Sequence, residues 1–145
     1  LNEEVDLGLR RFKILHDVAT VHAFKGDEAG ARESDLAALK EMDRLLALDP
    51  DAGAKAAEVH RDRALTLISL GRPEEALAAA DRSLKYMDGD WDQVKGDLTR
   101  AKALKALGRV DEARIAAEKS AKLAHRVAKG PVEYAESDEF LETLK

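Results

Sequence analysis

Apolar residues recur every three or four positions along most of this chain, which is the spacing of one face of an α-helix. Two of the apolar stripes run directly into a glycine, at Gly71 and at Gly108. Glycine readily adopts the left-handed conformation that ends a helix. A second stripe follows each glycine after a few polar residues, so the pattern predicts pairs of helices joined by tight turns.

Proline and glycine positions set the limits of the expected helices. Pro50 disfavours helix at the residue before it, so the second helix should stop at Asp49. Pro73 lies where the first turn of a new helix can begin. The expected helices cover residues near 3–25, 28–48, 53–70, 73–87, 91–107 and 110–128. A linker at residues 129–131 and a last short helix near residues 137–144 follow.

The sequence contains an internal repeat. Residues 63–86 and 100–123 match at many positions when they are shifted by 37 residues, and a weaker copy around Gly26 lies 45 residues before Gly71. Each copy has two alanines that are 12 residues apart, and small side chains let two helices approach closely. The three pairs are Ala19 with Ala31, Ala64 with Ala76, and Ala101 with Ala113.

These alanines and glycines resemble the pattern of the tetratricopeptide (TPR) repeat family, over roughly residues 12–124. The sequence departs from that pattern where the family has an early tryptophan-like residue, because His60 and Asp97 occupy the position here. Its spacings of 37 and 45 residues also exceed the usual repeat of about 34. The resemblance implies an all-α fold, a right-handed α-solenoid of about three antiparallel helical hairpins. Residues 1–128 would form the repeat domain, and residues 129–145 a linker and a C-terminal capping helix.

TPR proteins usually bind a peptide or a partner domain in a concave groove lined by the first helix of each hairpin. Carried over to this sequence, the resemblance places twelve residues in the groove: Lys13, His16, Thr20, Phe24, Glu58, Arg61, Leu65, Ile68, Lys95, Leu98, Lys102 and Lys105. Five of them are basic, and Glu58 is the single acid. We therefore expect a protein partner with an acidic segment. The alternative is that these lysines are ordinary solvated side chains, since exposed ion pairs contribute little.

A subfamily of TPR proteins holds C-terminal carboxylates with lysines, an arginine and two asparagines. Asn2 is the one asparagine in this chain, and it lies outside the expected groove, so the resemblance does not extend to this clamp.

Composition argues against other classes of partner. The formal net charge is −5 and aromatic residues make up 4% of the chain, which does not suit binding to nucleic acid. No apolar run approaches the roughly 20 residues needed to cross a bilayer, so we expect no membrane insertion. The sequence has no cysteine, which favours a reducing compartment such as the cytoplasm. It begins at Leu1, so it does not reveal whether a signal peptide was removed.

The sequence offers no set of residues for catalysis, for a cofactor or for a metal. The acidic run at residues 88–92 begins like a calcium-binding loop, but Gln93 and Thr99 stand where that loop requires glycine and glutamate. No two histidines have the spacing that places both on one helix face. We therefore expect a protein-interaction module rather than an enzyme. The competing interpretation is a structural or oligomerisation arm of a larger protein, which leaves a homo-oligomer open.

Overall fold

Seven α-helices make up most of the part of the chain that the structure describes, and this part contains no β-strand. The structure is a computed structural model and describes residues 2–49 and 55–145. The helices are α1 (Asn2–Phe24), α2 (Glu28–Leu48), α3 (Ala56–Ser69), α4 (Pro73–Leu84), α5 (Asp90–Ala106), α6 (Val110–Val127) and α7 (Pro131–Glu142).

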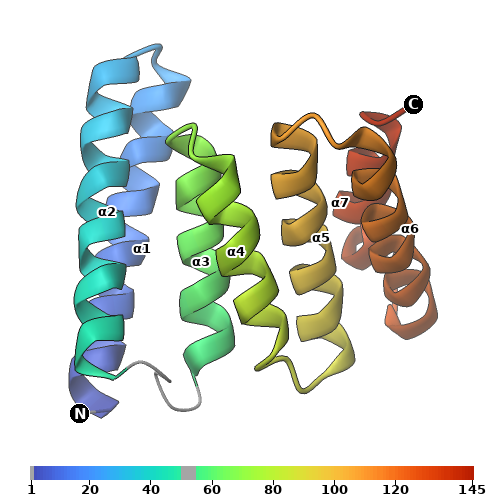
Figure 1. Cartoon of the computed structure of the whole chain (residues 1–145), viewed down its shortest axis with the longest axis horizontal. Helices are drawn as coiled ribbons and strands as arrows, with labels where there is room; N and C mark the ends of the chain where they lie inside the picture. Colours follow the sequence, from blue (N-terminus) through green and yellow to red (C-terminus); the bar gives the residue numbers. More distant parts are fainter. Residues whose placement is uncertain (1, 50–54) are drawn as a thin grey trace.

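The helices pack as a row of pairs, α1 with α2, α3 with α4 and α5 with α6, and α7 packs on α6 (Figure 1). We call these pairs unit 1, unit 2 and unit 3. The second helix of each unit also packs against the first helix that follows it, so that α2 contacts α3 and α4 contacts α5. The first helices α3 and α5 contact each other as well. The prediction of an all-helical fold built from packed helix pairs is confirmed.

Most of the expected helix limits agree with the structure to within about three residues, and the last helix differs most. We expected a linker at residues 129–131 and a helix near 137–144, whereas α7 begins at Pro131 and ends at Glu142. A proline fits the first position of a helix because that residue needs no backbone N–H partner. The linker is therefore shorter than expected. Part of the expected start of the third helix, at residues 53–54, lies outside the described residues.

Three glycines make the turns inside the units. Gly26, Gly71 and Gly108 have φ values of 79°, 72° and 78°, the left-handed region that other residues rarely adopt. At the turn in unit 2, the Gly71 N–H donates to the Ile68 carbonyl and the Arg72 N–H donates to the Leu67 carbonyl. These bonds satisfy carbonyl groups that the end of α3 would otherwise leave without a partner.

We expect Gly71→Ala to lower the free energy of unfolding by about 1 kcal/mol, because a Cβ atom is strained in the left-handed region. An added Cβ would meet no atom within 4 Å, so a steric clash does not contribute. Chemical denaturation followed by circular dichroism measures the loss. Gly71→Asn is the control and should lose less, since asparagine tolerates this conformation. Equal losses for the two variants would contradict this explanation.

The paired alanines lie in the core of units 2 and 3. Ala64 and Ala76 are both 0% exposed and share one apolar cluster, and Ala101 and Ala113 do the same in unit 3. This burial agrees with the expectation that the two helices of a unit approach closely at these residues. Unit 1 differs, because its alanine Ala31 is half-buried and lines an open pocket described below.

Two hydrogen bonds from serine side chains repeat between units 2 and 3. The Ser83 hydroxyl donates to the Ala57 carbonyl at 2.8 Å, and 37 residues later the Ser120 hydroxyl donates to the Val94 carbonyl at 2.9 Å. Ser120 also lies 2.9 Å from the Ser137 hydroxyl, which ties α6 to α7. Each serine therefore satisfies its own polar group while it fills a small-residue position of the second helix.

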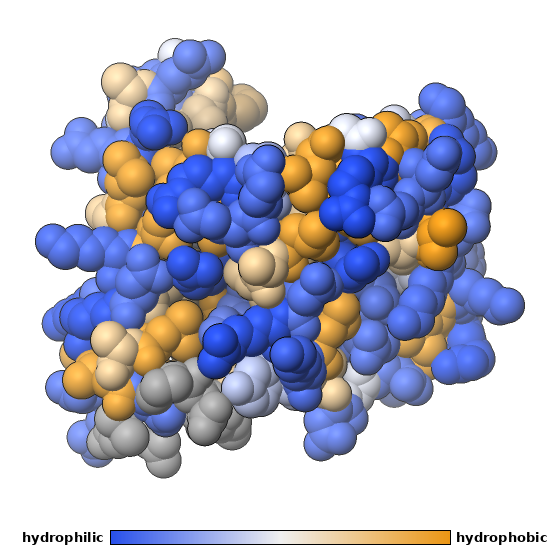
Figure 2. Space-filling model, viewed as in Figure 1, coloured by the Kyte–Doolittle hydropathy of each residue, from blue (hydrophilic) through white to orange (hydrophobic). Residues whose placement is uncertain are grey.

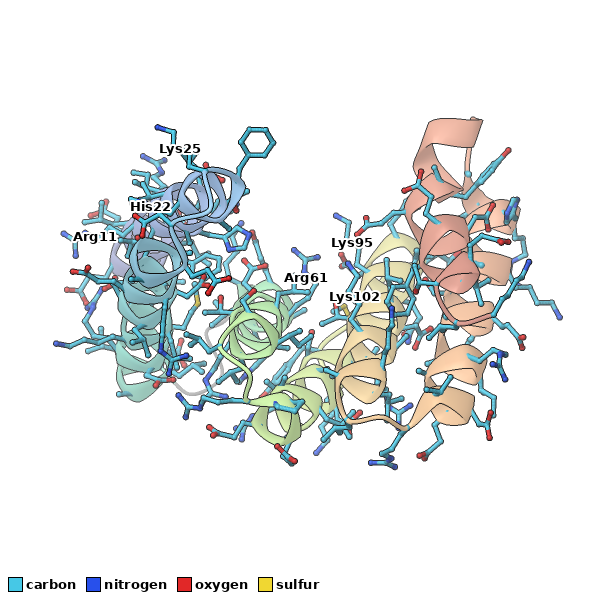
Figure 3. The ribbon with its side chains drawn as sticks, turned by 90° about the horizontal axis from the view of Figure 1, so that it is seen from above. Arg11, His22, Lys25, Arg61, Lys95 and Lys102 are labelled. Atoms are coloured by element: carbon cyan, nitrogen blue, oxygen red, sulfur yellow. The ribbon has the colours of Figure 1, made fainter. Side chains whose placement is uncertain are left out.

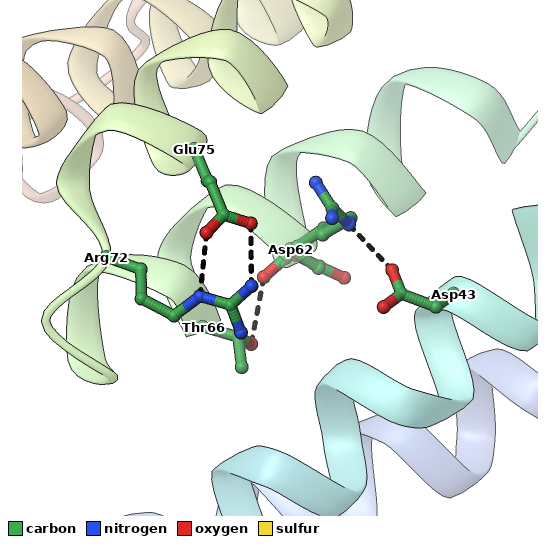
Figure 4. Close-up of polar contacts among 6 residues, drawn as sticks. Asp43, Asp62, Thr66, Arg72 and Glu75 are labelled. Carbon is green, nitrogen blue, oxygen red and sulfur yellow. Dashed lines mark hydrogen bonds and ion pairs between the residues drawn. The ribbon is translucent and has the colours of Figure 1, made fainter.

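Two exposed ion pairs repeat in the same way. Arg72 at the start of α4 binds Glu75 at 2.7 Å (Figure 4), and Arg109 at the start of α6 binds Glu112. These pairs place a carboxylate in the first turn of a helix, where the helix dipole favours negative charge. The local chemistry of the turn thus recurs along with the backbone.

Candidate partner-binding surface

The first helices of the units line one hollow side of the molecule. In Figure 3 the side chains of Arg61, Lys95 and Lys102 point into the space between α1 on one side and α7 on the other. Arg61 lies on α3, and Lys95 and Lys102 lie on α5. We call this side the first-helix hollow. By contrast, the face shown in Figure 2 is mostly hydrophilic, with apolar side chains interspersed.

A depression of about 250 Å³ lies at one end of the first-helix hollow, between α3 and the start of α5. Its lining carries three basic and two acidic side chains: Lys55, Arg61, Lys95, Glu58 and Asp92. The Arg61 guanidinium lies 3.5 Å from the Asp62 carboxylate, a long contact for an ion pair. Lys95 is exposed and its ammonium group forms no ion pair with any described residue. The depression therefore has positive charge available for an outside carboxylate.

Next to this depression, α1 and α3 are joined by an ion pair. The Lys13 ammonium lies 3.0 Å from the Glu58 carboxylate. Partial burial acts to raise the pKa of Glu58, but the hydrogen bond and charge of Lys13 outweigh it and leave that pKa below its usual value. Lys13 thus neutralises the one acid of the expected groove. Asp62, which the repeat pattern did not single out, lies nearby, and burial raises its pKa.

At the other end of the hollow, α7 engages two of the expected groove lysines. Lys102 pairs with Glu136 at 3.0 Å. Lys105 donates to the Thr143 hydroxyl at 3.0 Å and lies 5.5 Å from the centre of the Phe140 ring, a cation–π distance. These contacts come from a helix that we expected to act as a cap. Glu136 neutralises the charge of Lys102, whereas Lys105 keeps its charge but its ammonium group is held by the tail.

The remaining expected groove residues divide by burial. Leu98 is 5% exposed and belongs to the interior, so the prediction that it contacts a partner in the groove is not supported. Leu65 and Ile68 are half-buried, and Phe24 is 93% exposed at the end of α1. Thr20 donates to the carbonyl of its own helix at His16, at 3.0 Å.

His16 and Thr20 lie in a second feature, a pocket of about 640 Å³ between α1, α2 and the end of α3. Asp35 on α2 lines this pocket, is 7% exposed, and forms no hydrogen bond or ion pair with any described residue. Burial raises the pKa of the Asp35 carboxyl, and the charge of His16 partly opposes this shift. In the repeat, Asp35 corresponds to Ala80 and Ala117, which are 1% and 0% exposed, so unit 1 has an acid where units 2 and 3 have a buried alanine.

We expect Asp35→Asn to raise the free energy of unfolding by about 1 kcal/mol at pH 7, because a buried charged group without a partner is costly. The folded-state pKa of Asp35 lies above its unfolded value, so folding favours the protonated acid. The gain should therefore be present at neutral pH and disappear as the pH falls below about 4, where the wild-type acid is neutral.

Denaturation of both proteins at pH 7 and pH 3 measures this difference. Asp17→Asn is the control, because Asp17 is exposed on α1 and forms no ion pair with the described residues. A gain for Asp35→Asn that is the same at both pH values would show that the charge is not the cause.

Other chemistry receives little support in the described ranges. No group of three or more histidine, cysteine or acidic side chains is placed to hold a metal ion within residues 2–49 and 55–145. His60 is buried and its ring stacks on that of Tyr86, with centroids 5.7 Å apart. Gly89 occupies the N-cap position of α5, and no side chain bonds to that helix end. None of the helices described is long and apolar enough to cross a bilayer.

Comparison with protein-family models, with curated proteins and with solved structures found no match for this chain.

Proposed function

We propose that this chain is a protein-interaction module, a TPR-like right-handed solenoid that binds an acidic segment of a partner protein in the first-helix hollow. Three observations support the solenoid: the repeated alanine pairs, the left-handed glycines and the paired serine bonds. We do not assign it an enzymatic activity.

The observation that carries the binding proposal is the Lys95 ammonium, which has no ion-pair partner among the described residues, beside Arg61 in the depression. Like charges gathered in a concave surface raise the local potential and attract a partner of opposite charge. Leu65 and Ile68, half-buried on the same helix as Arg61, can pack against apolar side chains of the bound segment. The net charge of −5 makes this basic region a local exception.

To test this function, a library of random peptides should be selected on the immobilised protein, and the affinity of the recovered peptides measured by fluorescence anisotropy. We expect enrichment in aspartate and glutamate. Lys95→Glu should weaken binding on the order of tenfold, which corresponds to about 1.4 kcal/mol. The effect should be smaller in high salt, because salt screens exposed charges.

Lys122→Glu is the matched control, since Lys122 is an exposed lysine of α6 without an ion pair among the described residues. Lys122→Glu should change the affinity by less than about twofold, because an exposed charge outside the hollow contributes little to binding. Recovery of peptides without acidic enrichment, or equal losses for the two variants, would reject the proposal.

The alternative function, an oligomerisation arm that uses the tail helix, has weaker support. Phe140, Leu141 and Leu144 of the tail pack in the core cluster of unit 3, so this apolar face is already used within the chain.

A further inference from the structure

The outer side of α1 carries an exposed apolar stripe. Leu7, Ile14, Val18 and Val21 are 48%, 63%, 40% and 51% exposed. Their spacings of seven, four and three residues place them on one face of the helix, in the pattern of a coiled-coil seam. We call this stripe the outer α1 face. Solenoid ends usually carry a polar outer surface, so four exposed apolar residues in one row require an explanation.

The repeat shows what covers this face in the other units. Ile14 corresponds to Val59 on α3 and to Gly96 on α5, which lie 45 and 82 residues later. Val59 is 0% exposed, and a Cβ atom added to Gly96 would lie 2.6 Å from the Leu84 side chain of α4. The position of Ile14 is thus buried wherever a second helix precedes it.

The position of Val18, the next residue of the stripe, also contacts a preceding second helix in units 2 and 3. Val18 corresponds to Arg63 and Arg100, and each arginine binds an aspartate of the preceding second helix. Arg63 contacts Asp43 of α2 at 2.9 Å (Figure 4), and Arg100 contacts Asp81 of α4 at 2.8 Å. Valine replaces these arginines in unit 1, so a helix that covered this position would meet an apolar side chain.

The position of Val21, the last residue of the stripe, is also covered in units 2 and 3. Val21 corresponds to Thr66 and Ala103, both of which are 0% exposed, and Ala103 shares a cluster with alanines of α4. In units 2 and 3 this face is therefore covered by a helix that runs antiparallel to it (Figure 1). In unit 1 no described residue covers it.

Basic side chains flank the stripe and indicate the charge of its partner. Arg10, Arg11 and Lys25 are exposed and form no ion pair with any described residue. Figure 3 shows Arg11 on the side of α1 that faces away from the first-helix hollow. The acids near the stripe are Glu3, Glu4 and Asp6 in the first part of the helix, and Asp17, which lies three residues after Ile14. From residue 10 to residue 25 the border of the stripe is therefore mainly basic.

We propose that the outer α1 face binds an acidic amphipathic α-helix of a partner protein, which lies antiparallel to α1 and covers Ile14, Val18 and Val21. A second copy of this chain fits less well, because it would bring the same three cations, Arg10, Arg11 and Lys25, to the interface. The surface is separate from the first-helix hollow, so this inference does not depend on the function proposed above.

The probe for this test is a capped, fluorescently labelled helical peptide of 21 residues, with leucine at heptad positions a and d and glutamate at positions e and g. Its affinity for the full chain is measured by fluorescence anisotropy. We expect Ile14→Lys to weaken binding by at least about tenfold, because an exposed isoleucine would no longer be buried on binding. Ile115→Lys is the matched control, an isoleucine of α6 that is 68% exposed, and it should leave the affinity unchanged.

Further variants separate this face from the hollow and test the charge. Lys95→Glu should weaken binding of the helical peptide much less than Ile14→Lys does, since Lys95 lies in the hollow. Arg11→Glu should weaken binding of the acidic peptide, and a peptide with lysine in place of each glutamate should bind at least about tenfold more weakly to the wild-type chain. Circular dichroism of each variant establishes that it is folded.

Four results would overturn the proposal. They are no binding of the acidic peptide, equal binding of the acidic and basic peptides, equal losses for Ile14→Lys and Ile115→Lys, or a loss for Lys95→Glu as large as that for Ile14→Lys. Sedimentation of the protein alone tests whether a second copy occupies the face. A dimer that Ile14→Lys dissociates would assign the face to a second copy instead of a partner helix.

Discussion

Leu104→Ala should lower the free energy of unfolding by about 2–5 kcal/mol, the largest effect that we expect from any single substitution in this chain. Leu104 is 0% exposed and packs with the alanines of unit 3 and with Leu144 beyond α7. Its removal leaves a cavity, because side chains as small as alanine cannot move to fill the space. Since a domain of this size is stable by roughly 5–15 kcal/mol, the loss would be a large part of the total.

Urea denaturation monitored by circular dichroism at 222 nm measures this loss. Leu36→Ala is the matched control, since Leu36 on α2 is 44% exposed and should lose no more than about 0.5 kcal/mol. Leu67→Ala should resemble Leu104→Ala, because Leu67 is the equivalent residue of unit 2 and is also 0% exposed. If Leu104→Ala lowered the free energy of unfolding as little as Leu36→Ala does, Leu104 would not lie in a packed core.

Ala76→Leu is the second substitution with a large expected effect, a loss of about 1–3 kcal/mol or more. Ala76 is 0% exposed and packs in the same cluster as Ala64 of the neighbouring helix. Three additional carbon atoms have no space there, so α3 and α4 would have to separate. Such a separation would also disturb the contact of α4 with α5, through which unit 2 packs on unit 3.

Ala78→Leu controls for the change of residue type, because Ala78 is exposed on the same helix. Alanine and leucine have similar helix propensities, so this control should change stability by less than about 0.5 kcal/mol. Denaturation under the conditions used for Leu104→Ala gives both values. A stable Ala76→Leu variant would mean that close helix approach at the alanine pairs is not required.

Much of the fold could be predicted from the sequence, because helix periodicity and turn residues act locally. Gly71 and Gly108 mark helix ends through their own backbone preferences, which require no knowledge of distant contacts. The sequence predicts a start of α7 that is several residues too late, because the apolar residues Phe140 and Leu141 lie in the second half of this helix. Pro131 was interpreted as part of a linker, although proline is also common at the first position of a helix.

The binding surface was harder to predict, because charge pairing depends on residues that are far apart in the sequence. The repeat pattern placed Lys102 and Lys105 in a free groove, but it could not show that Glu136 and Thr143 reach them from α7. The exposed stripe on α1 could have been found by aligning the three first helices, since Ile14 then aligns with Val59 and Gly96. Aligning the second helices would also find Asp35, which stands where units 2 and 3 have the buried alanines Ala80 and Ala117. That its carboxylate has no partner among the described residues depends on how unit 1 packs against α3.

The most direct test of the central claim is a titration of the isotopically labelled protein with a selected acidic peptide, followed by two-dimensional amide NMR. We expect the largest shifts at residues of α3 and α5 that face the first-helix hollow, with Arg61, Ile68 and Lys95 among them. Shifts confined to the second helices α2, α4 and α6, or none at low salt, would contradict the assignment of this hollow as the site where a partner binds.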